Sequence, residues 1–199
     1  MSRSQSSPSN TLLEASTVPE SATEEVFDAL ARPAETNLLV VSYRDTPDAW
    51  LRDWRGFGGD LPSEVGFVHV GNATRSGAVS GATRTTGGPS SSDDGPSVVK
   101  AVSDPTDLAR VGVTASEYLE TWEDNARQTV VYLDSLTALL ESVAFDRAFE
   151  FFHVLAGRVE SVDGRGYYLL DPTAHDHRSL SAVRELADAV VDLDATSEN

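Results

Sequence analysis

The stretch Gln128–Leu140, QTVVYLDSLTALL, decides the fold. Uncharged residues run from Thr129 to Leu133, and Asp134 and Ser135 follow at once, before a second apolar run. A short apolar run that ends in a carboxylate is typical of a buried parallel strand with one acid at its carboxyl end. Ligands bind at that end of the strands in open α/β sheets, so Asp134 is a candidate site residue.

Short apolar segments alternate with amphipathic segments on both sides of this stretch. The expected strands are 11–15, 37–42, 65–70, 98–102, 129–133, 167–170 and 189–193, and the expected helices are 19–31, 47–54, 114–126, 145–159 and about 179–187. This alternation predicts a three-layer α/β/α domain with a mainly parallel sheet. We expect one domain over residues 11–194, with a flexible Gly/Ser/Asp-rich loop at about 71–97 and disordered tails at 1–10 and 195–199.

The chain is strongly acidic. Its 199 residues include 32 acids and 15 bases, giving a formal net charge of −17, and Lys100 is the only lysine. Such a charge opposes binding to nucleic acid and to anionic membranes, which are polyanions. Abundant Asp with almost no Lys is similar to haloarchaeal proteins in general, whose acidic surfaces suit high salt. The acidity therefore identifies no partner.

Several other classes of protein are excluded or disfavoured. The absence of cysteine excludes disulfides, thiolate zinc sites and thiol nucleophiles. The Ser-rich N-terminus lacks the apolar segment of a signal peptide, and no apolar run approaches the roughly 18 residues of a membrane span. We expect a soluble cytoplasmic protein.

Polar side chains gather where the predicted strands end, which is where parallel strands present a binding edge. The candidate site residues are Ser16, Ser21, Arg44, Asp45, Asp134 and Ser135. A second group, Asp171, His175 and His177, has the residue types of a metal site, although the same residues suit a polar loop that caps the following helix. Ser135 with His153 and an acid would make a hydrolase triad, but no GxSxG turn surrounds the serine, and we expect His153 to be a partly buried structural residue.

Four segments in chain order carry a family resemblance that spans residues 12–193. VVSYRDTPD (40–48), VVYLDSLTALL (130–140), RGYYLLDP (165–172) and AVVDL (189–193) resemble the RecA/KaiC-like ATPases. The resemblance implies that Asp134 takes the place of the acid that helps to hold Mg²⁺, and that Arg44 and Asp45 stand where the catalytic acids follow the second strand. More closely, DPTDLARVG and FFHVLAGRVESVDG resemble an uncharacterised haloarchaeal family, some members of which are labelled HTR-like, or transducer-like.

The sequence departs from an ATPase at the phosphate-binding loop. A P-loop needs glycines to cradle phosphate and a lysine for the β and γ oxygens. The corresponding segment, STVPESATEE (16–25), has neither, and its three glutamates would repel phosphate at a helix N-terminus. One of the two acid positions after the second strand is occupied by Arg44. We therefore expect a RecA-like domain with a degenerate P-loop that has lost nucleotide hydrolysis.

The predicted function is that of a non-catalytic RecA/KaiC-like regulatory or protein-interaction domain, without a cofactor, in haloarchaeal signal transduction. The expected partner is a protein, and homo-oligomer formation stays open. The alternative is a nucleotide-binding, ATPase-like module that uses Asp134 with ATP and Mg²⁺. A metal-dependent hydrolase at Asp171, His175 and His177 is a third reading.

Overall fold

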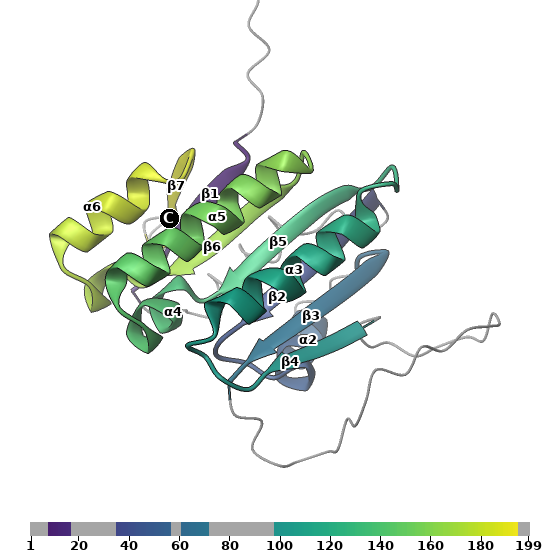
Figure 1. Ribbon diagram of the computed structural model, residues 1–199, viewed down its shortest axis with the longest axis horizontal. Helices are drawn as coiled ribbons and strands as arrows, with labels where there is room; N and C mark the ends of the chain where they lie inside the picture. The colour runs from purple at the N-terminus through teal and green to yellow at the C-terminus, as the bar shows by residue number, and fades with distance from the viewer. Residues whose placement is uncertain (1–7, 17–34, 57–60, 72–97, 195–199) are drawn as a thin grey trace, which may run out of the picture.

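The computed structural model describes residues 8–16, 35–56, 61–71 and 98–194 (Figure 1). The described strands are β1 (Asn10–Glu14), β2 (Thr36–Ser42), β3 (Glu64–Val70), β4 (Val98–Val102), β5 (Gln128–Asp134), β6 (Arg165–Leu170) and β7 (Ala189–Asp192). The described helices are α2 (Pro47–Gly56), α3 (Leu108–Trp122), α4 (Leu136–Ser142), α5 (Phe145–Ser161) and α6 (His177–Glu185), with a short 3₁₀ turn at Pro172–Ala174.

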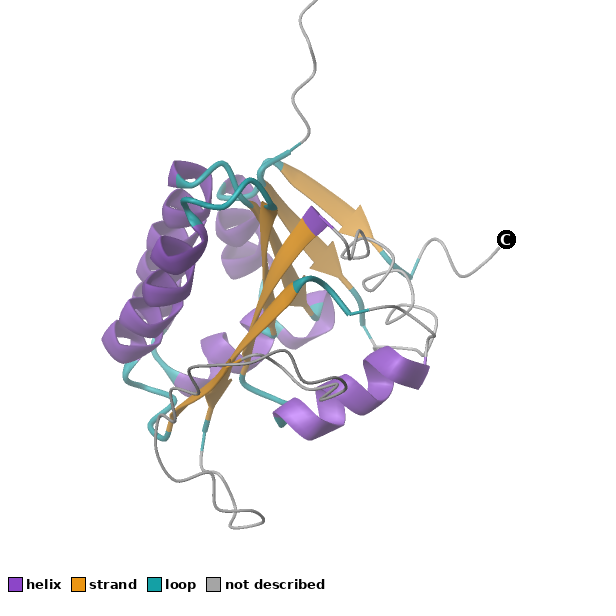
Figure 2. Cartoon of the chain, turned by 90° about the vertical axis from the view of Figure 1, so that its right-hand side faces the viewer, coloured by secondary structure: helices purple, strands orange, loops and turns teal. Residues whose placement is uncertain are grey.

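The seven strands form one sheet in the order β4-β3-β2-β5-β6-β1-β7, and every pairing is parallel. Helices α3, α5 and α6 cover one face of the sheet, and α2 covers the other (Figure 2). This arrangement confirms the predicted three-layer α/β fold.

Burial of the central strand β5 on both of its faces explains the uncharged run in its sequence. Val131 and Leu133 enter the core under α3 and α5, whereas Val130 and Tyr132 enter the core under α2. All four side chains are at most 5% exposed. A strand that is buried on both faces reads as a continuous apolar run, because neither face can place polar groups in water.

Several helix boundaries differ from the prediction, and capping explains two of the helix starts. Helix α3 begins at Leu108 rather than near residue 114, because the Asp107 side chain accepts the Arg110 N–H and starts the helix earlier. Helix α6 begins at His177, where Asp176 supplies the cap, and ends at Glu185. The apolar run after Asp134, which we did not assign as a helix, forms α4.

Several expectations fall on residues that the structure does not describe. The predicted helix 19–31, nearly all of the loop at 71–97, the first seven residues and the tail at 195–199 lie outside the described ranges. Within those ranges, none of the helices combines the length and the apolar character needed to cross a membrane.

Candidate functional site

The direction in which successive strands are added to the sheet reverses between β2 and β5. After β2 the chain moves outward to β3 and β4, whereas after β5 it moves the other way to β6. In doubly wound sheets the ligand site lies outside the carboxyl ends of the two strands where this reversal occurs. The pair Ser42 and Asp134 stands at that place, because these residues are register partners at the ends of β2 and β5.

Asp134 is buried, and residues of the same chain contact its carboxylate. The residue is 4% exposed. Arg44 donates from Nη1 to Oδ1 at 3.4 Å, and the Ser42 hydroxyl also bonds the carboxylate. Ser42 Oγ in turn accepts the backbone N–H groups of Arg44, at 3.2 Å, and of Asp45, at 2.8 Å. One serine therefore fixes both the acid at the end of β5 and the turn that carries its cationic partner.

The electrostatic environment of Asp134 favours the protonated form. Burial raises the pKa of Asp134 to about 7, and the nearby Asp45 carboxyl acts in the same direction. Arg44 and the Ser42 hydroxyl lower this pKa, but not enough to offset burial. Near neutral pH the group thus exchanges between a neutral acid and a carboxylate paired with Arg44.

A cavity of about 340 Å³ lies beside this pair, at the ends of β1, β2, β5 and β6. It brings together four of the sequence-predicted residues, Ser16, Arg44, Ser135 and Asp171. The other lining residues are Ala15, Thr137, Ala138, Glu141 and Leu169. The lining of the cavity therefore includes one cation and two acids.

The hydroxyl groups at this cavity already have partners within the chain. Ser16 Oγ donates to the Asp194 carboxylate at 2.6 Å. Ser135 caps α4 by accepting the Ala138 N–H at 3.2 Å, and Thr137 Oγ1 accepts the Asp171 N–H at 2.8 Å. These bonds stabilise the loops around the cavity, and their partners are carboxylate or backbone groups rather than a histidine base.

Sequence reasoning missed Thr137 and Glu141. Both lie on α4, and the apolar run in which they occur was not assigned as a helix. The available signal was Ser135, which could have been recognised as an N-cap followed by a helical stripe of leucines. Ser21 lies outside the described residues.

The candidate metal ligands do not converge. Asp171 caps the 3₁₀ turn by accepting the N–H and hydroxyl of Thr173. His177 is exposed at the start of α6, where Ser181 bonds its backbone carbonyl. Over the described ranges, no three His, Asp or Glu side chains come together as a metal site requires. The bonds of Asp171 are those of a capping loop.

Ser135 and His153 also lack the arrangement of a hydrolase triad. His153 was expected to be partly buried, but it is exposed on α5, whereas Ser135 is 5% exposed at the end of β5. The expectation for His153 was wrong because the helix is amphipathic: its apolar face includes Phe152 and Leu155, and residue 153 falls on the opposite side.

The arrangement fits Mg²⁺ poorly. Hard cations need ionised oxygen ligands, but burial raises the pKa of Asp134 to about 7, and the Arg44 guanidinium already pairs with this carboxyl group at 3.4 Å. A cation at Asp134 would have to displace Arg44 and face its charge. The arrangement fits an internal structural pair better.

Comparison with solved structures supports the fold. The uncharacterised protein PH0321 from Pyrococcus horikoshii, crystallised in complex with an unknown peptide, aligns with a TM-score of 0.63 at 15% identity, covering 92% of this chain and 76% of that one. PH0250 from Pyrococcus horikoshii OT3 aligns with a TM-score of 0.55 at 13% identity, covering 94% of this chain and 81% of that one. At these identities the likeness concerns the fold.

Comparison by sequence identifies a family. No curated protein matches the chain. One family model, described as a family of unknown function, matches residues 9–193, which is nearly all of the sequence. The chain therefore belongs to the DUF7504 family.

Proposed function

We propose that this chain is a non-catalytic, RecA/KaiC-like protein-interaction domain with a regulatory role, and that its strand-edge site is a structural remnant. One observation carries the proposal: Asp134, the acid that a nucleotide site would use, is buried against Arg44 and Ser42 of its own chain. A catalytic acid must be free to contact a metal ion or a water molecule. Here the carboxylate is bound within the chain.

The sequence of the first loop supports the same reading. Phosphoryl transfer depends on positioning the phosphate and neutralising its charge, and residues 16–25 supply neither glycine nor lysine for that task. In the cavity, Arg44 is the cation, while Glu141 and Asp171 add negative charge. A triphosphate would therefore meet more repulsion than attraction.

A protein or peptide is the class of partner that fits best. PH0321, which shares the fold, was crystallised with an unknown peptide. That observation belongs to PH0321, and we extend only the class of ligand to this chain. The resemblance to HTR-like haloarchaeal proteins favours signal transduction as the setting.

The alternative is a nucleotide-binding module that uses Asp134 with Mg²⁺. The feature that favours it is the cavity of about 340 Å³ at the reversal point of the sheet, which is where this architecture binds ligands. In that case Arg44 would have to release Asp134 and turn to the phosphates.

Titration calorimetry with ATP and Mg²⁺ distinguishes the two functions. We expect no saturable heat, measured in molar KCl so that self-repulsion of the acidic surface is screened. A one-to-one isotherm in the micromolar range that is weakened by Asp134→Ala would overturn the proposal and favour the nucleotide-binding module. Circular dichroism of both proteins in the same buffer checks that each remains folded.

A further inference from the structure

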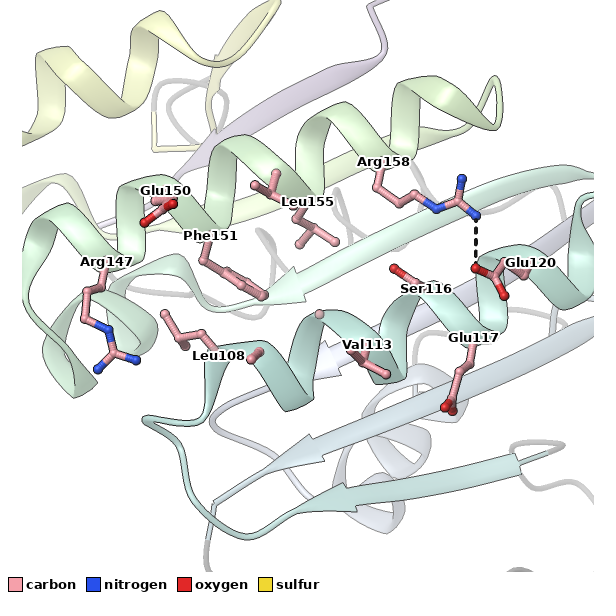
Figure 3. Close-up of a pocket in the computed structure, with 13 residues that line it drawn as sticks. Leu108, Val113, Ser116, Glu117, Glu120, Arg147, Glu150, Phe151, Leu155 and Arg158 are labelled. Atoms are coloured by element: carbon pink, nitrogen blue, oxygen red, sulfur yellow. Dashed lines mark ion pairs between the residues drawn. The ribbon is translucent and has the colours of Figure 1, made fainter.

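A groove runs between α3 and α5, on the outer surface of the molecule and away from the strand edge (Figure 3). It encloses about 690 Å³. Leu108, Phe151 and Leu155 lie at its floor and are at most 9% exposed. Charged residues line its two ends, with Arg147 and Glu150 at one end and Arg158 with Glu120 at the other.

The groove exposes apolar surface. Val113 on α3 is 57% exposed, and Val154 on α5 is 64% exposed. The other large apolar residues with high exposure among the described ranges, Val99, Val190 and Val191, lie on the edge strands β4 and β7. Two valines on neighbouring helices therefore border one hollow, and each keeps more than half of its side chain in water.

The helices are joined at the ends of the groove rather than at its centre. Arg158 on α5 reaches Glu120 at 3.8 Å and Glu123 at 3.9 Å on α3. At the other end, Arg147 donates to the carbonyl of Thr106, just before α3. These contacts tie α5 to α3 and to the turn before it on both sides of the hollow.

The charges around the groove are of both signs. Glu117, Glu120 and Glu150 are balanced in part by Arg147 and Arg158. A uniformly basic or acidic ligand would meet like charges somewhere along this surface, which costs binding energy. A partner that carries both signs in the reverse order fits better.

The order of the charges is self-complementary. On α5, Glu150 lies four residues before Val154, and Arg158 lies four residues after it. Four residues span about 6 Å of helix. If a second α5 lay antiparallel across the first, with the two Val154 side chains at the centre, each Glu150 would face the Arg158 of the other copy. That arginine would then be shared with Glu120 and Glu123 of its own chain, which it reaches at 3.8 Å and 3.9 Å.

Helix α3 obeys the same symmetry. Arg110 lies three residues before Val113, and Glu117 lies four residues after it. A two-fold axis at right angles to the helices would place both α3 and α5 antiparallel to their copies. Because Glu117 is already paired with Lys100 of its own chain at 2.7 Å, the pairing of opposite charges across the axis would be carried by α5. The two valines and their symmetry mates would meet at the centre of a four-helix arrangement.

We propose that the groove between α3 and α5 is a homodimer interface, occupied by the same groove of a second copy. The inference rests on the proposed interaction function, and it names the partner. Two helices of about 25 Å, roughly 10 Å apart, present a face of about 500 Å² in projection, which corresponds to the smaller specific interfaces. We therefore expect a reversible dimer.

Sedimentation velocity over a range of protein concentrations tests the dimer, at salt concentrations from moderate to molar KCl. The high end screens the net repulsion between two chains of charge −17, and the low end leaves contacts between facing charges effective. The wild-type chain should dimerise reversibly. Val154→Glu should abolish the dimer, because it buries two carboxylates at the two-fold axis. Glu185→Arg, a charge change at an exposed position on α6, is the matched surface control and should leave the dimer unchanged.

A charge-exchange experiment tests the symmetry itself. Glu150→Arg and Arg158→Glu should each weaken self-association by roughly tenfold, since two like-charge contacts replace two opposite-charge contacts. An equimolar mixture of the two variants should recover the dimer, because the arginine introduced in one variant then faces the glutamate introduced in the other, and the remaining pair is as in the wild type. A role of these residues confined to the monomer would give no recovery on mixing.

A wild-type chain that stays monomeric at every concentration would overturn the proposal, as would a dimer that Val154→Glu does not affect. Neither result bears on the calorimetric test with ATP, so failure of the dimer and failure of the proposed function are distinguishable. If the dimer fails and the proposed function stands, the partner that binds the groove would be a different protein. Melting curves of each variant confirm that loss of the dimer is not loss of folding.

Discussion

The end of β5 and the groove between α3 and α5 differ in whether their side chains find partners within the chain. At the end of β5, a carboxylate that could bind a ligand is buried and bonded to Ser42 and Arg44. In the groove, Val113 and Val154 could pack in a core, but they remain exposed. Binding lowers the free energy of a folded chain most where side chains still lack partners, as exposed apolar side chains do. The comparison therefore points away from the place where this architecture usually binds ligands and toward the helical surface.

The comparison is tested most strongly by a matched pair of valines. Val131→Ala in β5 removes two methyl groups from a site with no exposure and should lower the free energy of unfolding by about 2 kcal/mol. Val154→Ala should change it by less than about 0.5 kcal/mol, as at other exposed positions. Urea unfolding, at a protein concentration too low for dimers to form, measures both changes in the free energy of unfolding. Equal costs would mean that Val154 is packed within the monomer.

Removing the cation at the strand edge should cost stability in a pH-dependent way. Arg44→Met leaves the Asp134 carboxylate without its guanidinium, and we expect a loss of about 1–2 kcal/mol above pH 7. As the pH falls through about 7, Asp134 becomes protonated and has less need of Arg44. The loss should therefore fade toward pH 5. A cost that is independent of pH would show that Arg44 acts by packing alone.

The raised pKa of Asp134 makes a separate prediction about the slope of stability with pH. Because the folded chain holds this proton up to about pH 7 and the unfolded chain releases it near 3.8, the folded state binds more protons between those values. The stability contributed by the neutral acid is thus lost as the pH rises through this window, by at most about 1.4 kcal/mol per unit. Asp134→Asn should remove this contribution. The difference in unfolding free energy between the variant and the wild type, followed from pH 4 to pH 8, isolates it from other titrating groups.

Substitution of two glycines by alanine should give the smallest change in stability, and it tests whether the groove is an interface. Gly112 on α3 lines the groove, whereas Gly157 on α5 does not. An added methyl group would meet Phe151 at 3.6 Å in the first case and nothing within 4 Å in the second. Both alanine variants should gain about 0.5–1 kcal/mol from helix propensity, measured by thermal unfolding. If the groove is a dimer interface, Gly112→Ala alone should also change the dimer dissociation constant.

The elements of the fold were predictable where the local pattern is strong. The uncharged run before Asp134 and the stripe of apolar residues from Phe145 onward gave β5 and α5 nearly to the residue. The start of α3 was missed, because a single capping side chain, Asp107, outweighed the weaker apolar periodicity of the residues that follow it. The order of the strands was not predicted, since pairing depends on contacts between distant segments.

The two surfaces differ in how far the sequence could reveal them. The strand-edge candidates could be proposed because each stands next to an apolar run, and the structure places several of them around one cavity. The raised pKa of Asp134 could not be foreseen, since it depends on the approach of Asp45 and on depth of burial. The groove was invisible for a different reason. Val113 and Val154 lie outside the apolar stripes that the sequence predicts, and their apolar character alone does not show that they border a groove.

The position of β1 has a consequence for how the chain reaches this fold. The strand lies between β6 and β7, and its Asn10 is bonded by the Tyr168 hydroxyl across 158 positions of sequence. The Asp188 carboxylate accepts the Asn10 N–H from still further along the chain. Such long-range pairing slows folding, because the entropy of closing a large loop is lost before the contacts form. During synthesis, the first strand must wait for nearly all of the described chain before it can pair, so its apolar residues are exposed to aggregation or to capture by chaperones in the meantime.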